Sequence, residues 1–226
     1  MYSIITTDGF IIDSRPSGEA GKLLYIFTRD HGLVMATAQG IRLEKSKLRY
    51  FIQDYSFGTY SFVKGKEYWR LTNAQESQEE RRMKNEECES LELQEERRMK
   101  NEECESQKAN KTRLGDKKEL VAKVALLLKK MLHGEEANPA LFDVVESLRA
   151  ICAEGRPPRV GLYNDSALES LIVLRIFHKL GYIGDMKELN LLLNNNDISG
   201  EILATVEINR VFINTQINKA IKESHL

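Results

Sequence analysis

A cluster of cations and aromatic residues has the chemistry of a surface that binds polyanions. Four cations and two aromatic residues lie within ten positions: Arg42, Lys45, Lys47, Arg49, Tyr50 and Phe51. Lysine and arginine neutralise phosphates and release condensed counterions, and exposed aromatic rings offer faces on which unpaired bases stack. We therefore take this cluster as the candidate site for nucleic acid.

A second interpretation of the same residues stays open. The cations can belong to a solvated charged loop, with Tyr50 and Phe51 pointing into a hydrophobic core. Under the nucleic-acid interpretation, Lys22, Lys64 and Lys66 extend the basic track. Arg15 and Arg29 are weaker candidates, because residues in turns are commonly charged.

The sequence offers little chemistry for catalysis. Its four histidines, His31, His133, His178 and His225, have no acid-base or metal partner at a recognised spacing. It contains no phosphate-binding glycine loop followed by lysine, and its carboxylates cluster in a repetitive segment that is not expected to hold them in a fixed, dry geometry. We predict a binding protein and not an enzyme, with no cofactor and no metal.

Charge is distributed unevenly along the 226 residues, although the net charge is only −1. Residues 1–75 carry +3, residues 76–106 carry −6, residues 107–130 carry +6 and the remainder carries −4. The block at 107–130 contains Lys108, Lys111, Arg113, Lys117 and Lys118. These cations can contact DNA at the entry to the helical domain, but we favour the interpretation in which they pair with the acidic segment before them or keep it soluble.

The first 75 residues predict a small barrel. Five segments rich in apolar, β-branched and aromatic residues alternate with turns: Tyr2 to Ile12, Lys22 to Thr28, Leu33 to Ala38, Tyr55 to Val63 and Glu67 to Thr72. Pro16 and Gly18 are expected to interrupt the first pair. The Asp30-His31-Gly32 sequence predicts a tight hairpin.

A tandem repeat follows the predicted barrel. The string QEERRMKNEECES occurs at 78–90 and again at 94–106, offset by 16 residues. Few apolar residues interrupt its charges, which predicts a solvated helix or a disordered linker. An offset of 16 is not a multiple of seven and argues against a regular coiled coil.

The rest of the chain has helical periodicity. Asp116 is expected to cap a first helix, Asn138 a second, and the Ser166-to-Glu169 capping box a third that ends at Gly181. A short helix near 187–193 and a last one from Ser199 through Ile221 complete the pattern. The predicted fold class is α+β, with an N-terminal five-stranded OB-fold β-barrel at 1–75, a charged linker at 76–110 and an α-helical domain at 111–226.

Several of these segments resemble the RecO family of bacterial recombination mediators. The resemblance rests on Gly18-Glu19-Ala20, on Phe27 to Gly32, and on Gly40 followed by the basic cluster. Farther along, Asn138 to Phe142, Leu180-Gly181-Tyr182 and the closing His225-Leu226 are similar to the helical domain of that family.

The resemblance implies that the protein binds single-stranded and double-stranded DNA, anneals complementary strands and assists recombinase loading with RecR. It also implies docking of the acidic, apolar C-terminal tail of single-stranded DNA-binding protein, for which we expect a groove in the helical domain. Some family members carry a four-cysteine zinc motif after the Leu-Gly-Tyr element, but residues 183–196 contain no cysteine. Zinc is therefore not expected here.

Other features bear on the environment of the protein and on a competing function. No apolar run approaches the roughly 18 to 20 residues that span a bilayer, and the first residues do not have the pattern of a secretory signal. We expect a cytoplasmic, nucleoid-associated protein whose three cysteines are free thiols. The modest charge of the barrel leaves a second hypothesis open, an OB-fold adaptor that binds protein without direct DNA binding.

Overall fold

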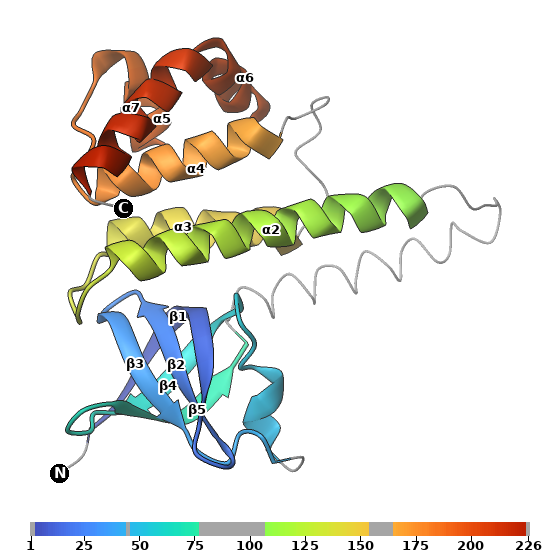
Figure 1. The fold of residues 1–226 in the computed structure, drawn as a ribbon, viewed down its shortest axis with the longest axis vertical. Coiled ribbons are helices and arrows are strands. Elements are labelled where there is room, and N and C mark those ends of the chain that lie inside the picture. Colours follow the sequence, from blue (N-terminus) through green and yellow to red (C-terminus); the bar gives the residue numbers. More distant parts are fainter. Residues whose placement is uncertain (1–2, 44–45, 77–106, 154–164, 225–226) are drawn as a thin grey trace. The chain divides into compact units, whose positions relative to one another are not determined.

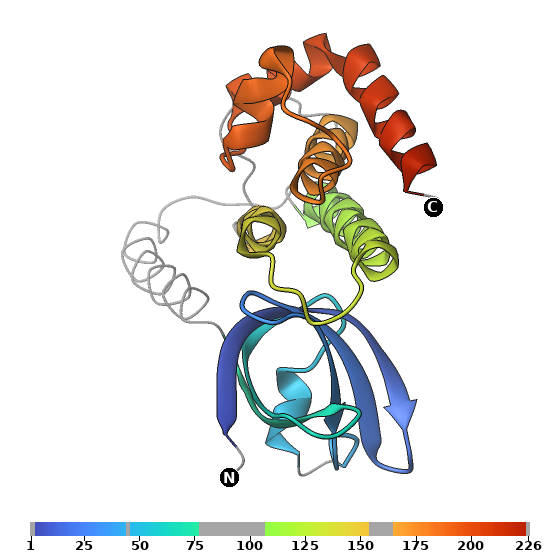
Figure 2. The ribbon, with the colours of Figure 1, turned by 90° about the vertical axis from the view of Figure 1, so that its left-hand side faces the viewer.

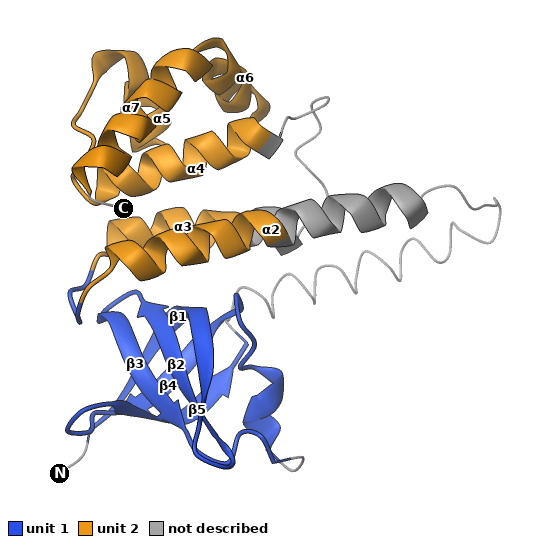
Figure 3. Cartoon of the chain, in the orientation of Figure 1, with its two compact units in different colours: residues 1–113, 134–137 blue, residues 114–133, 138–226 orange. Residues whose placement is uncertain are grey.

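The computed structural model describes residues 3–43, 46–76, 107–153 and 165–224, with backbone only for 107–118, 149–153 and 165. The chain divides into two compact units (Figure 3). The first unit holds residues 1–113 and 134–137, and the second holds residues 114–133 and 138–226. The predicted tandem repeat, with Cys88 and Cys104, lies outside the described residues.

The first unit contains a closed five-stranded barrel, as predicted (Figures 1 and 2). Its strands are β1 (Ile4–Ser17), β2 (Gly21–Thr28), β3 (Gly32–Ala38), β4 (Phe57–Val63) and β5 (Trp69–Gln75). Around the barrel the order is β1-β2-β3-β5-β4, with β3 and β5 parallel and the other neighbours antiparallel. This mixed topology is that of an OB-fold.

Strand β1 is long because it pairs with two neighbours in turn. Its first part, Ile4 to Phe10, pairs with β4, and its second part, Gly9 to Ser17, pairs with β2. The sequence analysis was wrong in ending this strand at Ile12 and in expecting Pro16 to interrupt the pair, because β1 continues to Ser17 and Pro16 stands opposite Lys22 within the ladder. Proline is tolerated there because this end of β1 pairs only on the β2 side among the described residues.

The barrel interior follows the alternation of its strands. Thirteen buried apolar residues form its core cluster, including Leu24, Ile26, Val34, Phe62 and Trp69. The hairpin predicted at Asp30-His31-Gly32 is confirmed. Gly32 has φ +62°, and a Cβ added there would lie 2.2 Å from the carbonyl oxygen of Glu136, so a side chain is excluded on both grounds.

Helices form the second unit (Figure 1). The described part of the chain contains α2 (Gln107–Met131), α3 (Pro139–Ala153), α4 (Asp165–Lys179), α5 (Asn190–Asn194), α6 (Gly200–Ile208) and α7 (Arg210–Glu223), with a short 3-10 turn, η2 (Lys187–Leu189), before α5. None of these helices is both long and apolar enough to cross a membrane.

Helix α2 starts earlier than predicted. Asp116 was expected to be its N-cap, but the helix begins at Gln107, so Asp116 lies inside it. The residues from Gln107 to Arg113 are mostly good helix formers, which allows the helix to extend N-terminally without a cap at Asp116.

Two other predicted helix ends are confirmed. Asn138 caps α3, with its Oδ1 accepting a hydrogen bond from the backbone N–H of Leu141 at 2.9 Å. Gly181 follows α4 with φ +83°, and its N–H donates to the carbonyl of His178 at 3.0 Å.

The last predicted helix is in fact two. Asn209 separates α6 from α7, with a backbone of φ −96° and ψ 14° and with its Nδ2 donating to the carbonyl of Thr205 at 2.9 Å. This side-chain bond to the backbone competes with helical geometry. The break shifts the helical phase, and Val211, just after it, is 83% exposed.

Candidate nucleic-acid interface

The connection from β3 to β4 presents much of the predicted basic cluster. It contains a short 3-10 helix, η1 (Lys47–Tyr50), in which Lys47 and Arg49 are exposed. Leu48 and Phe51 pack against the barrel core and hold this turn in place. Anchored at two apolar residues, the turn displays its cations to solvent.

The two aromatic residues of the cluster have different environments. Tyr50 is 76% exposed, so its ring is accessible for stacking. Phe51 is half-buried against the barrel core. The interpretation in which both rings point into the core therefore does not describe Tyr50, whereas Phe51 serves packing at least in part.

The basic residues nearest the β1–β2 turn come from two segments. The backbone N–H of Arg42 donates to the carbonyl of Ala20 at 3.1 Å, which brings the start of the β3–β4 connection beside that turn. Lys22, at the start of β2, stands opposite Ala38 at the end of β3. Its ammonium donates to the hydroxyl of Ser14 at 3.3 Å, and this neutral partner is the contact found for it among the described residues. Lys45 lies outside the described residues.

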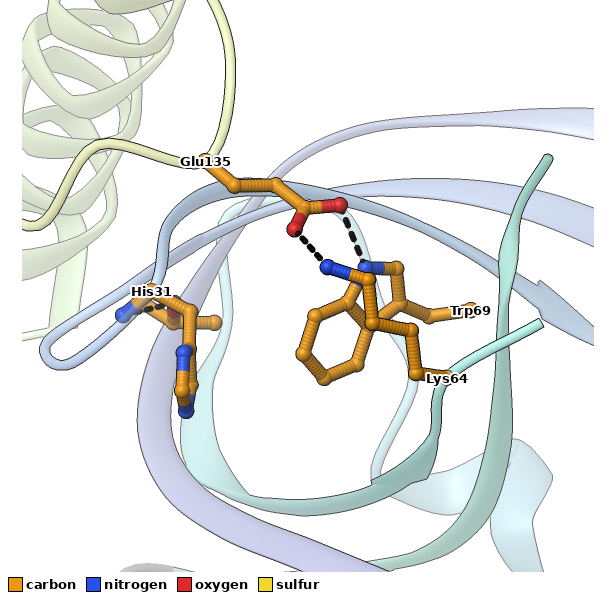
Figure 4. A network of polar contacts seen from close by, with 5 residues as sticks. His31, Lys64, Trp69 and Glu135 are labelled. Atoms are coloured by element: carbon orange, nitrogen blue, oxygen red, sulfur yellow. Dashed lines mark hydrogen bonds and ion pairs between the residues drawn. The ribbon is translucent and has the colours of Figure 1, made fainter. Parts of the chain in front are cut away.

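The β4–β5 loop carries the other two predicted lysines. Lys66 is exposed. Lys64 is also exposed, but its ammonium donates to a carboxylate oxygen of Glu135 at 2.7 Å and lies 5.1 Å from the centre of the Trp69 ring (Figure 4). The charge of Lys64 is thus already engaged, unlike that of Lys22.

Glu135 joins two groups of the barrel (Figure 4). Its other carboxylate oxygen accepts a hydrogen bond from the indole Nε1–H of Trp69 at 2.6 Å. The hydrogen bonds from Lys64 and then from Trp69 lower the pKa of Glu135, since both favour its charged form. The His31 ring lies 5.4 Å from that of Trp69, at a tilt of 47°. These contacts hold the ends of the β4–β5 loop, at Lys64 and Trp69, in place.

The sequence analysis missed part of the outer face of β1, β2 and β3. Tyr25 stands opposite Asp13 on one side and Met35 on the other, and Met35 is 41% exposed. The guanidinium of Arg15 lies 5.5 Å from the centre of the Tyr25 ring and 3.5 Å from Asp13. Alternation along β2 offered the signal, because the core positions of Leu24 and Ile26 place Tyr25 on the opposite face.

The helical unit contains an apolar groove of about 430 Å³ between α2, α4 and α7. Its lining includes Leu127, Val173 and Ile217, with Lys123 and Glu169 at its polar part. The Lys123 ammonium contacts Glu169 at 3.1 Å and Glu119 at 3.4 Å. Hydrogen bonding and charge attraction from Glu169 are the main causes that raise the pKa of Lys123.

The same unit holds a buried cation. Arg175 on α4 is fully buried, and its Nε and Nη2 donate to the carbonyls of Leu192 and Asp197 at 2.8 and 2.9 Å. Burial lowers the pKa of Arg175 to about 10, so it remains charged at neutral pH. Among the described residues, no group of three or more histidines, cysteines or carboxylates could hold a metal ion.

The barrel topology defines the first unit as an OB-fold domain. Its β3–β4 connection carries exposed cations and the exposed ring of Tyr50. Residues 1–78 match the family model described as Recombination protein O N terminal. The first 78 residues are therefore similar to the N-terminal domain of the RecO family, which confirms the resemblance for this part of the chain.

The chain is also similar to several proteins named DNA repair protein RecO. The chain is 32% identical over 72 residues to the DNA repair protein RecO of Alkaliphilus metalliredigens, covering 32% of this chain and 29% of that protein. It is 39% identical over 59 residues to the RecO of Desulfitobacterium hafniense, covering 26% and 22%. A match to the RecO of Halalkalibacterium halodurans, 26% identical over 153 residues, covers 68% of this chain and 49% of that protein.

These matches differ in extent. The 153 matched residues of the last relative exceed the 78 of the family model, so the likeness extends beyond the barrel. The matches span less than half the length of each of these relatives.

Proposed function

We propose that the protein is a recombination mediator that binds single-stranded and double-stranded DNA, anneals complementary strands and assists recombinase loading with RecR. One observation carries the proposal: a barrel of the RecO N-terminal family displays Arg42, Lys47, Arg49 and Tyr50 to solvent. Lys22, Lys45, Phe51, Lys64 and Lys66 complete the proposed site. The setting proposed for this activity is the cytoplasm, at the nucleoid.

The mechanism is binding and not bond chemistry. Cations on the barrel screen the repulsion between phosphates, which lets two strands approach each other. Stacking on exposed rings such as Tyr50 holds bases unpaired until a complementary strand arrives. Neither step needs a cofactor, a metal or a covalent intermediate.

Fluorescence anisotropy of a labelled single-stranded oligonucleotide, measured across a salt series, tests DNA binding. We expect log affinity to fall linearly with log salt, with a slope of about −0.7 for each phosphate contact. No binding at low salt would overturn the proposal and favour the protein-interaction adaptor.

Removal of charge tests the location of the site. Alanine at Arg42, Lys45, Lys47 and Arg49 together should weaken binding and flatten the salt slope, with the circular dichroism spectrum unchanged. DNA affinity equal to that of the wild type would show that the site lies elsewhere. A matched control replaces four helical-unit cations, Lys129, Lys179, Lys219 and Lys222, and should leave the slope unchanged.

We further propose that the groove between α2, α4 and α7 binds the C-terminal tail of single-stranded DNA-binding protein. Its apolar lining suits the apolar residues of that tail, and Lys123 can exchange Glu169 for a carboxylate of the tail. A labelled tail peptide should bind the wild type, and Val173→Glu should abolish that binding. A peptide that binds both proteins equally would exclude this groove.

A further inference from the structure

Tyr55 has a backbone conformation that normally calls for glycine. Its φ is +67°, and it is the one non-glycine residue with positive φ in the part of the chain that the structure describes. A positive φ is uncommon for a bulky side chain, because Cβ crowds the backbone. The predicted strand from Tyr55 to Val63 accordingly begins two residues later, at Phe57.

Two hydrogen-bonded features impose this conformation. Ser56 N–H donates to the carbonyl of Gln53 at 3.2 Å, which makes Tyr55 the third residue of a turn. Tyr55 N–H donates to the carbonyl of Ile11 at 2.8 Å, and Ile11 N–H donates to the carbonyl of Ser56 at 2.9 Å. Two residues thus face one across the ladder, which is a β-bulge with its first residue in the left-handed region. Glycine is the preferred residue in a turn or bulge of this kind.

All three of these hydrogen bonds join backbone groups, so none of them needs the side chain of Tyr55. Glycine or asparagine at this position would keep them and relieve the crowding at Cβ. The tyrosine side chain is 40% exposed, so its ring is partly open to solvent. A strained residue that the local fold does not require is a reason to look for a function of its side chain.

The surroundings of Tyr55 indicate which function. It lies in the same β3–β4 connection as Lys47, Arg49 and the exposed Tyr50. Its backbone lies beside β1 at Ile11, and the other edge of β1 pairs with β2, where Tyr25 is found. Tyr55 therefore lies next to a strand between two parts of the candidate interface.

We propose that Tyr55 is a base-stacking residue of the barrel, whose ring takes an unpaired base of single-stranded DNA. This proposal rests on the proposed DNA binding and adds a residue to it. The bulge holds the backbone of Tyr55 in place, so stacking on its ring requires little further ordering of the backbone.

The experiment compares three substitutions at this position. Tyr55→Asn and Tyr55→Gly suit the left-handed conformation but remove the ring, whereas Tyr55→Phe keeps it. We expect affinity for a labelled single-stranded oligonucleotide to fall about 5- to 100-fold in the first two and by less than twofold in Tyr55→Phe. The urea midpoint of unfolding should equal or exceed that of the wild type in Tyr55→Asn and Tyr55→Gly.

Controls separate this proposal from others. Tyr182→Asn removes a tyrosine of the helical unit that is 38% exposed, and should leave DNA affinity unchanged. Wild-type affinity in Tyr55→Asn would overturn the role of Tyr55, and so would an equal loss in Tyr55→Phe or Tyr182→Asn. A clear drop in the midpoint for both ring-removing variants would also overturn it, because the ring would then serve the fold. Failure of the wild type to bind DNA would instead refute the proposed function.

Discussion

The Glu135 carboxylate allows a quantitative test of the barrel's polar contacts. It accepts hydrogen bonds from the Trp69 indole at 2.6 Å and from the Lys64 ammonium at 2.7 Å. Glu135→Gln keeps an oxygen for the indole but removes the charge. Hydrogen bonds to charged groups contribute about 1.5–3 kcal/mol, and exposed ion pairs about 0–1 kcal/mol. Because the Glu135 side chain is 41% exposed, we expect a loss of only about 1 kcal/mol at pH 7 after discounting for solvent screening.

The direction of the pH dependence follows from the lowered pKa. The folded state favours the charged carboxylate, so the stabilisation is fully present above the ordinary pKa of 4.5. It decreases as the pH falls below that value and is gone once the pH is below the lowered folded pKa. The stability difference between wild type and Glu135→Gln should therefore be constant from pH 7 to about 5 and should vanish in more acidic solution.

Urea unfolding followed by tryptophan fluorescence provides the assay. Trp69 is the only tryptophan of the chain, so the signal comes from the barrel at the contact itself. Glu136→Gln is the matched control, since it removes the same charge from the neighbouring exposed position and should leave the midpoint unchanged. Equal stability of wild type and Glu135→Gln at pH 7, or a difference that persists unchanged at pH 3, would refute the reasoning.

Three further predictions follow from other contacts. Arg175→Leu leaves the carbonyls of Leu192 and Asp197 without their donor, so we expect a loss of about 2–4 kcal/mol in urea unfolding followed by circular dichroism at 222 nm; wild-type stability would refute this. Asn138→Ala removes the cap of α3 and should cost about 1 kcal/mol in the same assay, whereas Asn138→Asp should retain most of that stability. Lys47→Ala, which removes an exposed cation of η1, should reduce the magnitude of the salt slope of single-strand binding by about 0.7 if the residue contacts one phosphate, and an unchanged slope would remove Lys47 from the site.

Local signals predicted much of the fold. Segments rich in apolar, β-branched and aromatic residues, separated by turns, located all five strands, because such residues fill the barrel interior. Asn138 and Gly181 marked helix ends, since capping depends on a few neighbouring residues. The break at Asn209 escaped the same reasoning, because apolar residues continue at helical spacing on both sides of it.

The candidate site was predictable in composition but not in geometry. Charge alone identified Lys64 and Lys22 as equal candidates for binding phosphate. In the structure Lys64 pairs with Glu135, more than 70 residues away in the chain, whereas Lys22 contacts the neutral hydroxyl of Ser14. No local pattern connects such distant positions. Tyr25 was missed for a related reason: its neighbours Asp13 and Met35 become apparent only once the strand register is known.

Tyr55 shows where sequence reasoning must fail in principle. Its propensity favours an extended strand, and the sequence analysis placed it in one. The ladder partner that imposes its positive φ is Ile11, in a strand more than 40 residues earlier, and no feature of the residues around Tyr55 announces that bond. This conflict between local preference and tertiary structure is what indicates a function for the side chain of Tyr55. It appears at an exposed ring beside the basic cluster, where a contribution to binding can offset the cost in stability.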